Sequence, residues 1–197
     1  MPKVLWLDTE TTGLSEKSCI VQVAAIIVID GKEKERFNIN MRPFPDAEIS
    51  PEALKITGLT EAQIKAYPDP VDMHKKITGI FDKYIQKYNK ADKFILAGQN
   101  VGFDLTQMIR WFTRCNDPYL GSYIDFKRTL DTNQIFRAFQ LAKVFPELEN
   151  TKLVTIAKYF GIEFDAHDAM ADIEVTRTIG NKMIKMLRKL RPAKDDK

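Results

Sequence analysis

The first part of the chain alternates apolar segments of strand length with short polar turns. Residues 4–7 form an apolar run, and residues 20–29 are apolar at both alternating sets of positions, as in a central strand that is covered on both faces. Asp30-Gly31 predicts a two-residue hairpin, and the alternation over residues 37–41 predicts a third strand. We therefore expect the sheet to begin as an antiparallel meander.

Helical spacing of apolar residues begins at Ser50, and two segments of strand character, 94–97 and 129–132, interrupt it. This order predicts an α/β fold with a mixed five-stranded sheet, in which the antiparallel meander comes first and parallel strands follow, flanked by helices. His74 is expected on the solvated face of one helix. A short helix is expected to begin at Ser50, and residues 56–60 separate it from a second one. The later helical patterns cover residues 77–88, 105–112, 135–139, 153–160 and 168–190.

Composition and charge narrow the class of protein. The 197 residues fit a single domain, expected over 1–190, with a short basic and polar tail at 191–197. No apolar stretch reaches the roughly 20 residues that cross a bilayer, and no secretory signal is visible ahead of residue 4. Cys19 and Cys115 match no zinc spacing, so free thiols in a cytoplasmic, reducing compartment are expected.

The net charge of +3 is mild, but basic residues crowd the C-terminal segment. Such a cluster suits a polyanion, although a solvated helix face is the commoner explanation. The residues concerned are Lys182, Lys185, Arg188, Lys189, Arg191 and Lys194.

Two acids stand where the first strand ends. Side chains two residues apart on a strand share a face, so Asp8 and Glu10 are expected side by side while Thr9 turns away. Like charges at close range raise each other's pKa, and a bound divalent cation reverses that effect. Taken alone, the pair is equally consistent with a strand that runs into a polar turn.

Further acids lie at the beginnings of two predicted helices. Asp104 is expected in a first helical turn beside the strand ends, where an isolated acid commonly does no more than stabilise the helix N-terminus. Asp168 suits the N-cap of the last helix, which places His167 just outside that helix and Asp172 inside its first turn. An isolated histidine beside an acid is usually a surface or hydrogen-bonded residue.

Together these segments resemble the DEDDh family of 3′–5′ exonucleases, which have the DnaQ-like variant of the ribonuclease H fold. The family pattern is Asp-x-Glu followed by threonine and glycine, then Asn-x-x-Phe-Asp, then His-x-Ala-x-x-Asp. This chain has the three motifs in that order, at residues 8–13, 100–104 and 167–172. Leu130-Asp131-Thr132 looks like the family's Asp-Thr after a strand, and residues 56–60 look like its His-Gly segment with Thr57 replacing the histidine.

The resemblance implies an enzyme that hydrolyses single-stranded nucleic acid from a free 3′ hydroxyl to 5′-monophosphates. It implies that Asp8, Glu10, Asp104 and Asp172 hold two Mg²⁺ or Mn²⁺ ions, hard cations that prefer oxygen ligands. Asp8 would bridge both ions, Glu10 and Asp172 would complete the site of the attacking water, and Asp104 would support the second ion. His167 would accept the proton of that water.

The resemblance also implies which residues contact the terminal nucleotide. Phe103 is open to two interpretations, as a stacking surface for a base or as a core residue that packs its helix onto the sheet. DNA and RNA 3′ ends are both open as substrates, with a polymerase or another replication or repair protein as a candidate partner. The expected contacts are Thr11, Thr12, Gly13, Leu14, Asn100, Phe103 and His167.

Two other classes of protein compete with this interpretation. A catalytically silent nucleic-acid-binding module of the same fold would have no need for clustered acids that face phosphate. An all-helical metal phosphohydrolase built on His167 and Asp168 would not begin with strands.

Overall fold

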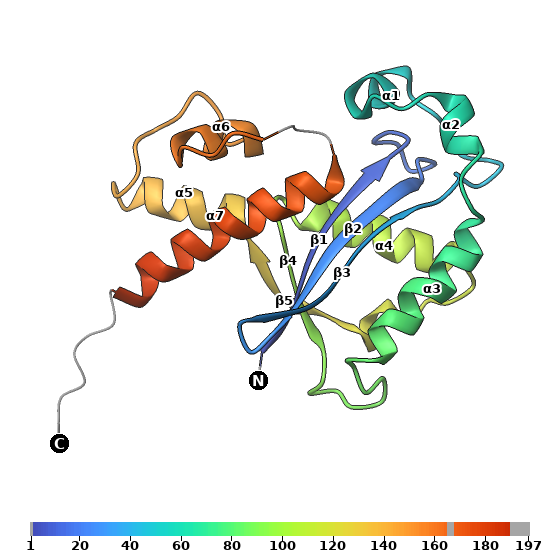
Figure 1. Ribbon diagram of the computed structural model, residues 1–197, viewed down its shortest axis with the longest axis horizontal. Coiled ribbons are helices and arrows are strands. Elements are labelled where there is room, and N and C mark those ends of the chain that lie inside the picture. Colours follow the sequence, from blue (N-terminus) through green and yellow to red (C-terminus); the bar gives the residue numbers. More distant parts are fainter. Residues whose placement is uncertain (1, 165–167, 190–197) are drawn as a thin grey trace.

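The computed structural model describes residues 2–164 and 168–189, which form one mixed sheet with helices on both faces (Figure 1). The strands are β1 (Lys3–Thr11), β2 (Ile20–Ile29), β3 (Lys32–Asn40), β4 (Phe94–Gly98) and β5 (Ile124–Asp131). The helices are α1 (Pro51–Thr57), α2 (Glu61–Lys65), α3 (Pro70–Asp82), α4 (Gly102–Arg114), α5 (Thr132–Leu141), α6 (Leu153–Tyr159) and α7 (Ala169–Lys189), with a short 3-10 helix at Leu120–Ser122.

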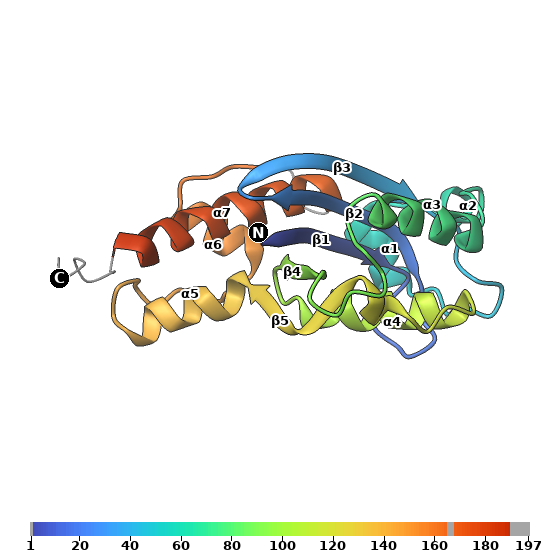
Figure 2. The ribbon, with the colours of Figure 1, turned by 90° about the horizontal axis from the view of Figure 1, so that it is seen from below.

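The sheet has five strands in the order β3-β2-β1-β4-β5. β1 pairs antiparallel with β2, and β2 antiparallel with β3, whereas β4 is parallel to β1 and β5 is parallel to β4. The predicted fold class is therefore confirmed. Helices α5, α6 and α7 gather at one end of the molecule and α1, α2 and α3 at the other (Figures 1 and 2).

Alternation along β1 divides the core between the two faces of the sheet. Leu5 and Leu7 pack with residues of α3 and α4, whereas Trp6 packs with Ala169 and Ile173 of α7 on the opposite face. β2 is buried on both faces, as its continuous apolar run predicts. A smaller apolar cluster joins α5, α6 and α7.

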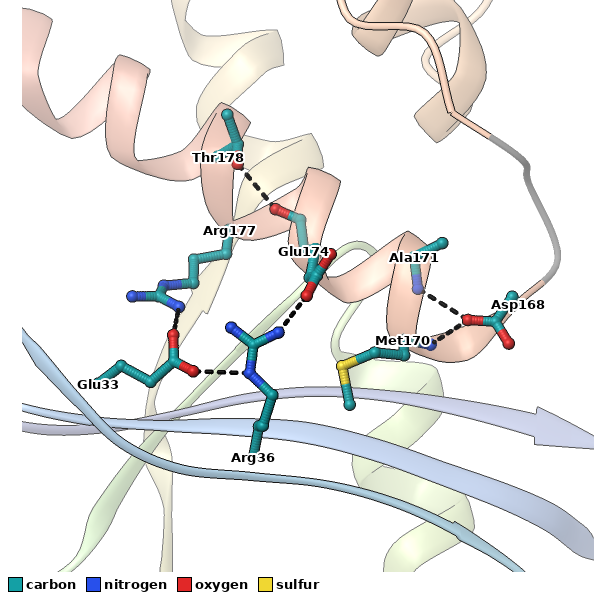
Figure 3. Close-up of polar contacts among 8 residues, drawn as sticks. All are labelled: Glu33, Arg36, Asp168, Met170, Ala171, Glu174, Arg177 and Thr178. Atoms are coloured by element: carbon teal, nitrogen blue, oxygen red, sulfur yellow. Dashed lines mark hydrogen bonds and ion pairs between the residues drawn. The ribbon is translucent and has the colours of Figure 1, made fainter.

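Helix α7 lies against the sheet because apolar contacts and a glycine let it approach closely. A Cβ atom at Gly180 would stand 2.5 Å from Cη2 of Trp6, so the indole fills the space that a side chain would need. At the rim, Arg36 of β3 donates to Glu33 and to Glu174 of α7, and Arg177 donates to Glu33 over 2.5 Å (Figure 3). These exposed ion pairs contribute little each, so apolar packing fixes the helix.

Two expectations about α3 are wrong. His74 is only 7% exposed rather than solvated, and its ring lies edge-on to Phe112 with ring centroids 4.4 Å apart. The helix ends at Asp82 and does not extend to Tyr88, which is fully exposed. After α3 the chain turns back toward β4, which begins at Phe94. Within this turn Asp92 accepts a hydrogen bond from the backbone N–H of Gln86.

β5 begins at Ile124, five residues before the expected strand at 129–132. Cys19 and Cys115 are free, as expected. None of the helices within 2–164 and 168–189 is both long and apolar enough to cross a bilayer. The predicted tail at 191–197, with Arg191 and Lys194, lies outside the described residues.

We expect Gly180→Ala to destabilise the protein by about 1–3 kcal/mol, because the added methyl group overpacks the contact with Trp6. Gly79→Ala is the matched control. Gly79 is also helical, but an added Cβ would meet nothing within 4 Å, so alanine there should leave stability unchanged or raise it by up to about 1 kcal/mol. Urea unfolding of both variants measures the contrast, and equal stabilities would contradict the close approach of α7.

Candidate active site

The end of β1 has a free edge, because β4 pairs with β1 only as far as Trp6 and Ala97. Asp104, in the first turn of α4, occupies that edge. One of its carboxylate oxygens accepts hydrogen bonds from the backbone N–H of Thr9 over 2.9 Å and from the Thr9 hydroxyl over 2.7 Å. Asp104 is only 3% exposed, so β1 and α4 fix this acid together.

Asp8 and Glu10 meet Asp172 of α7. Each of the three offers a carboxylate oxygen, and these atoms all lie within 4.8 Å of one another. Among the acids, histidines and cysteines of the described residues, these three acids form the group that lies close enough together to hold a metal ion. The predicted pairing of Asp8 with Glu10, and their meeting with Asp172 from the far end of the chain, are both seen in the structure.

The start of α7 sets the position of Asp172. Asp168 accepts hydrogen bonds from the backbone N–H groups of Met170 over 3.0 Å and Ala171 over 2.9 Å, which confirms it as the N-cap (Figure 3). The carbonyl of Asp168 also accepts from the N–H of Asp172 over 2.9 Å. His167 lies outside the described residues.

The electrostatics of the cluster are unfavourable without a cation. Burial raises the pKa of Asp8 well above its ordinary value, and the charges of Asp104, Glu10 and Asp172 raise it further. Burial, followed by the charge of Asp172, raises the pKa of Glu10 to about 7. Burial also raises the pKa of Asp104 to about 7, against the opposing effect of the two hydrogen bonds from Thr9. A divalent cation would remove this repulsion, and an all-carboxylate donor set fits a hard ion.

A cleft of about 360 Å³ adjoins the acids. It collects Thr11, Gly13, Leu14 and Phe103, four of the residues expected to contact substrate. Leu14 is 84% exposed and Phe103 is 37% exposed, so Phe103 is available at the surface and is not a buried core residue.

The far wall of the cleft comes from α1, whose contribution the sequence did not predict. Ala53, Ile56 and Thr57 line it, and Ile56 is 56% exposed. The hydroxyl of Thr57, where the family pattern has histidine, donates to the carbonyl of Ala53 within its own helix. The signal in the sequence was the resemblance of residues 56–60 to the family's His-Gly segment, which includes Ile56.

The side chains of Thr12 and Asn100 form hydrogen bonds within the protein. Thr12 is buried, and its hydroxyl donates to the carbonyl of Glu48 over 2.6 Å, which links the loop after β1 to the segment before α1. The side-chain oxygen of Asn100 accepts from Asn133 over 2.5 Å. Neither residue lines the cleft, and their contacts with substrate stay predictions.

Comparison with known proteins agrees with this geometry. The exonuclease family model RNase_T matches residues 5–179. The PolC-type DNA polymerase III of Bacillus subtilis is 28% identical over 185 residues, which cover 90% of this chain and 11% of that protein. The 3′-5′ exonuclease DinG of Bacillus subtilis is 26% identical over 187 residues, which cover 93% of this chain and 18% of that protein.

Among solved structures, E. coli exonuclease I in complex with a dT13 oligonucleotide superposes with a TM-score of 0.76 at 26% identity, over 96% of this chain and 42% of that chain. The chain thus spans less than half the length of each of these three proteins. Because the family model covers most of the chain and the sheet order and acid motifs agree with it, this chain belongs to the exonuclease family of ribonuclease H-like DEDD enzymes.

Proposed function

We propose that this chain is a metal-dependent 3′–5′ exonuclease that hydrolyses single-stranded nucleic acid from a free 3′ hydroxyl to 5′-monophosphates. The observation that supports it most is the meeting of Asp8, Glu10 and Asp172 within 4.8 Å, beside an Asp104 that Thr9 holds in place. A binding module without catalysis would gain nothing from buried acids that repel one another and a phosphate. The intact cluster therefore argues against the silent alternative.

The donor set suits two Mg²⁺ or Mn²⁺ ions, which Asp8, Glu10, Asp172 and Asp104 would hold. When bound, divalent ions would supply the charge that activates the attacking water and stabilises the leaving oxygen. In this proposal the protein holds the four carboxylates at fixed positions, and His167 acts as the general base that accepts a proton from the water.

The cleft beside the acids supports a single-stranded substrate. Leu14, Ile56 and Phe103 offer apolar surface on which an unstacked base can lie, and such contacts tolerate any base. The dT13 oligonucleotide bound to E. coli exonuclease I favours DNA, with RNA as the alternative to be tested. The PolC-type relatives suggest a polymerase or another replication or repair protein as partner, and the two free thiols suit a cytoplasmic location.

We expect the protein to release 5′-monophosphates from the 3′ end of linear single strands, because the family resemblance implies that the loop after β1, which lines the cleft beside the acids with Gly13, holds the 3′ hydroxyl. A 3′ phosphate should block the reaction. The measurement is a time course on matched single-stranded DNA, single-stranded RNA and duplex substrates labelled at either end. Circular single strands are the control, and cutting them as fast as linear strands would refute the exonuclease proposal.

We expect Asp8→Asn to abolish activity and yet to make the metal-free protein more stable at pH 8, because the substitution removes a charge that burial and the neighbouring acids disfavour. The pKa values of Asp8 and Glu10 are raised by folding, so the folded protein binds more protons than the unfolded chain does. Stability of the metal-free wild type should accordingly fall as the pH rises from about 5 through 7. Mg²⁺ should restore it at pH 8.

Thermal unfolding in EDTA and in Mg²⁺, from pH 5 to pH 8, measures these effects. Glu147→Gln is the matched control, because Glu147 is an exposed acid far along the chain from the cluster and its neutralisation should change neither activity nor the pH dependence. A metal-free Asp8→Asn variant that is less stable than the wild type at pH 8 would contradict the assigned repulsion. Full wild-type activity in EDTA would contradict the metal requirement.

A further inference from the structure

One carboxylate outside the acid cluster joins the beginnings of two helices. Asp131, the last residue of β5, is the N-cap of α5 and accepts hydrogen bonds from the backbone N–H groups of Asn133 over 2.9 Å and Gln134 over 3.3 Å. The same side chain reaches across to the turn between β4 and α4. There it accepts from the N–H of Asn100 over 3.2 Å and from the N–H of Val101 over 3.2 Å.

The backbone N–H groups in the turn between β4 and α4 need a hydrogen-bond acceptor from outside the turn. A Cβ atom at Gly98 would stand 2.9 Å from the carbonyl oxygen of Leu7, so the backbone there passes directly against β1. Asn100 follows in the left-handed conformation, with φ of 56°, which non-glycine residues seldom adopt. The N-cap residue of α4 is Val101, whose side chain makes no capping hydrogen bond. The two N–H groups before the helix are thus held by Asp131.

A continuous path of contacts leads from Asp131 to the acid cluster. Val101 precedes Asp104 by less than one helical turn, and the N–H of Leu105 donates to the carbonyl of Val101 over 3.0 Å, which fixes that turn. Asp104 then meets Thr9, the residue between Asp8 and Glu10 on β1. A shift of the first turn of α4 would move Asp104 relative to β1.

We propose that Asp131 is a positioning residue for catalysis: by binding the N–H groups of Asn100 and Val101 it sets where Asp104 stands beside Asp8. The proposal deepens the exonuclease function and rests on it. Asp131 does not belong to the group of acids within 4.8 Å of one another, and its contacts with the N–H groups of Asn100 and Val101 connect it to the site through α4. The competing explanation is that Asp131 does no more than cap α5.

Two substitutions separate these explanations. Serine is as good an N-cap as aspartate, so Asp131→Ser keeps the cap of α5, but its single short oxygen loses the contacts with Asn100 and Val101. Asp131→Asn keeps one acceptor oxygen and places an amide at the other position, so it retains part of the link. If Asp131 positions Asp104, activity should fall in the order wild type, Asn, Ser. If it only caps α5, both variants should behave as wild type.

Steady-state kinetics on single-stranded DNA, with Mg²⁺ varied, is the first test. We expect Asp131→Ser to lower kcat by roughly 10- to 100-fold, the usual effect of losing a residue that orients a metal ligand. The KM for DNA should change less than about twofold, because the cleft of Leu14, Ile56 and Phe103 is untouched. The Mg²⁺ concentration for half-maximal rate should rise about tenfold, and Asp131→Asn should recover part of the loss.

Phe139→Leu is the control for stability. Phe139 is buried in the cluster that joins α5, α6 and α7 and is not part of the link to α4, so this variant loosens α5 without touching the turn before α4. Its kcat should stay within about twofold of the wild-type value, as expected of a core change far from the reacting groups. A loss in Asp131→Ser no larger than that in Phe139→Leu would overturn the proposal.

Mn²⁺ binding, followed by calorimetry, gives a readout that does not need turnover. Asp131→Ser should bind at least one Mn²⁺ roughly 10- to 100-fold more weakly than the wild type, and Phe139→Leu should bind it normally. A wild-type protein that binds Mn²⁺ but cleaves no nucleic acid would refute the exonuclease function alone. Unchanged Mn²⁺ affinity and unchanged kcat in both Asp131 variants of an active enzyme would refute the positioning role alone.

Discussion

The acids at the end of β1 repel one another, and the fold has to hold them together against that repulsion. Asp8 and Glu10 lie side by side with Asp172. Burial raises the pKa values of Asp8 and Glu10, and the charges of Asp104 and Asp172 raise both further. Short peptides with the sequences of β1 and α7 would not hold these carboxylates together. The apolar packing of β1 and β2 on both faces of the sheet supplies the favourable free energy that keeps them in place.

The two helices that complete the cluster approach from opposite faces of the sheet. α7 brings Asp172 to the face of Trp6, and α4 brings Asp104 to the free edge that β1 has beyond β4. A carboxylate binds backbone N–H groups at the start of each helix. Asp168 does so for α7, and Asp131 of β5 does so for the turn before α4. Because these hydrogen bonds go to backbone N–H groups that the fold holds in place, they constrain position more than exposed ion pairs between long side chains, such as that of Arg36 with α7.

Much of this arrangement could be predicted from the sequence, for reasons that are local. Alternation and the Asp30-Gly31 turn determine the meander, and the period of two along a strand determines that Asp8 and Glu10 share a face. The N-cap at Asp168 follows from residue chemistry. The three motifs, which resemble a known family, connect acids that lie far apart in the chain.

What could not be predicted depends on contacts between distant segments. His74 is buried because Trp111 and Phe112 of α4 cover it, and no pattern around residue 74 shows this. Thr9 was expected to point away from Asp8 and Glu10, and it does so. Because it points to the opposite face of β1, its hydroxyl reaches Asp104. Ile56 joins the cleft because the segment before α1 is bound to the loop after β1 through Thr12 and Glu48. Asp131 reaches Asn100 because β5 is parallel to β4 and the two strands end side by side.

We claim that Asp8, Glu10, Asp104 and Asp172 would hold two neighbouring divalent ions, and electron paramagnetic resonance of Mn²⁺ added to the metal-free protein tests this. The wild type should bind two Mn²⁺ per chain, with a spectrum broadened by coupling between the ions. His167→Asn should keep that spectrum, because the four carboxylates are intact, and Asp8→Asn should lose the coupling. A wild-type protein that binds no Mn²⁺, or two ions without coupling, would contradict the claim.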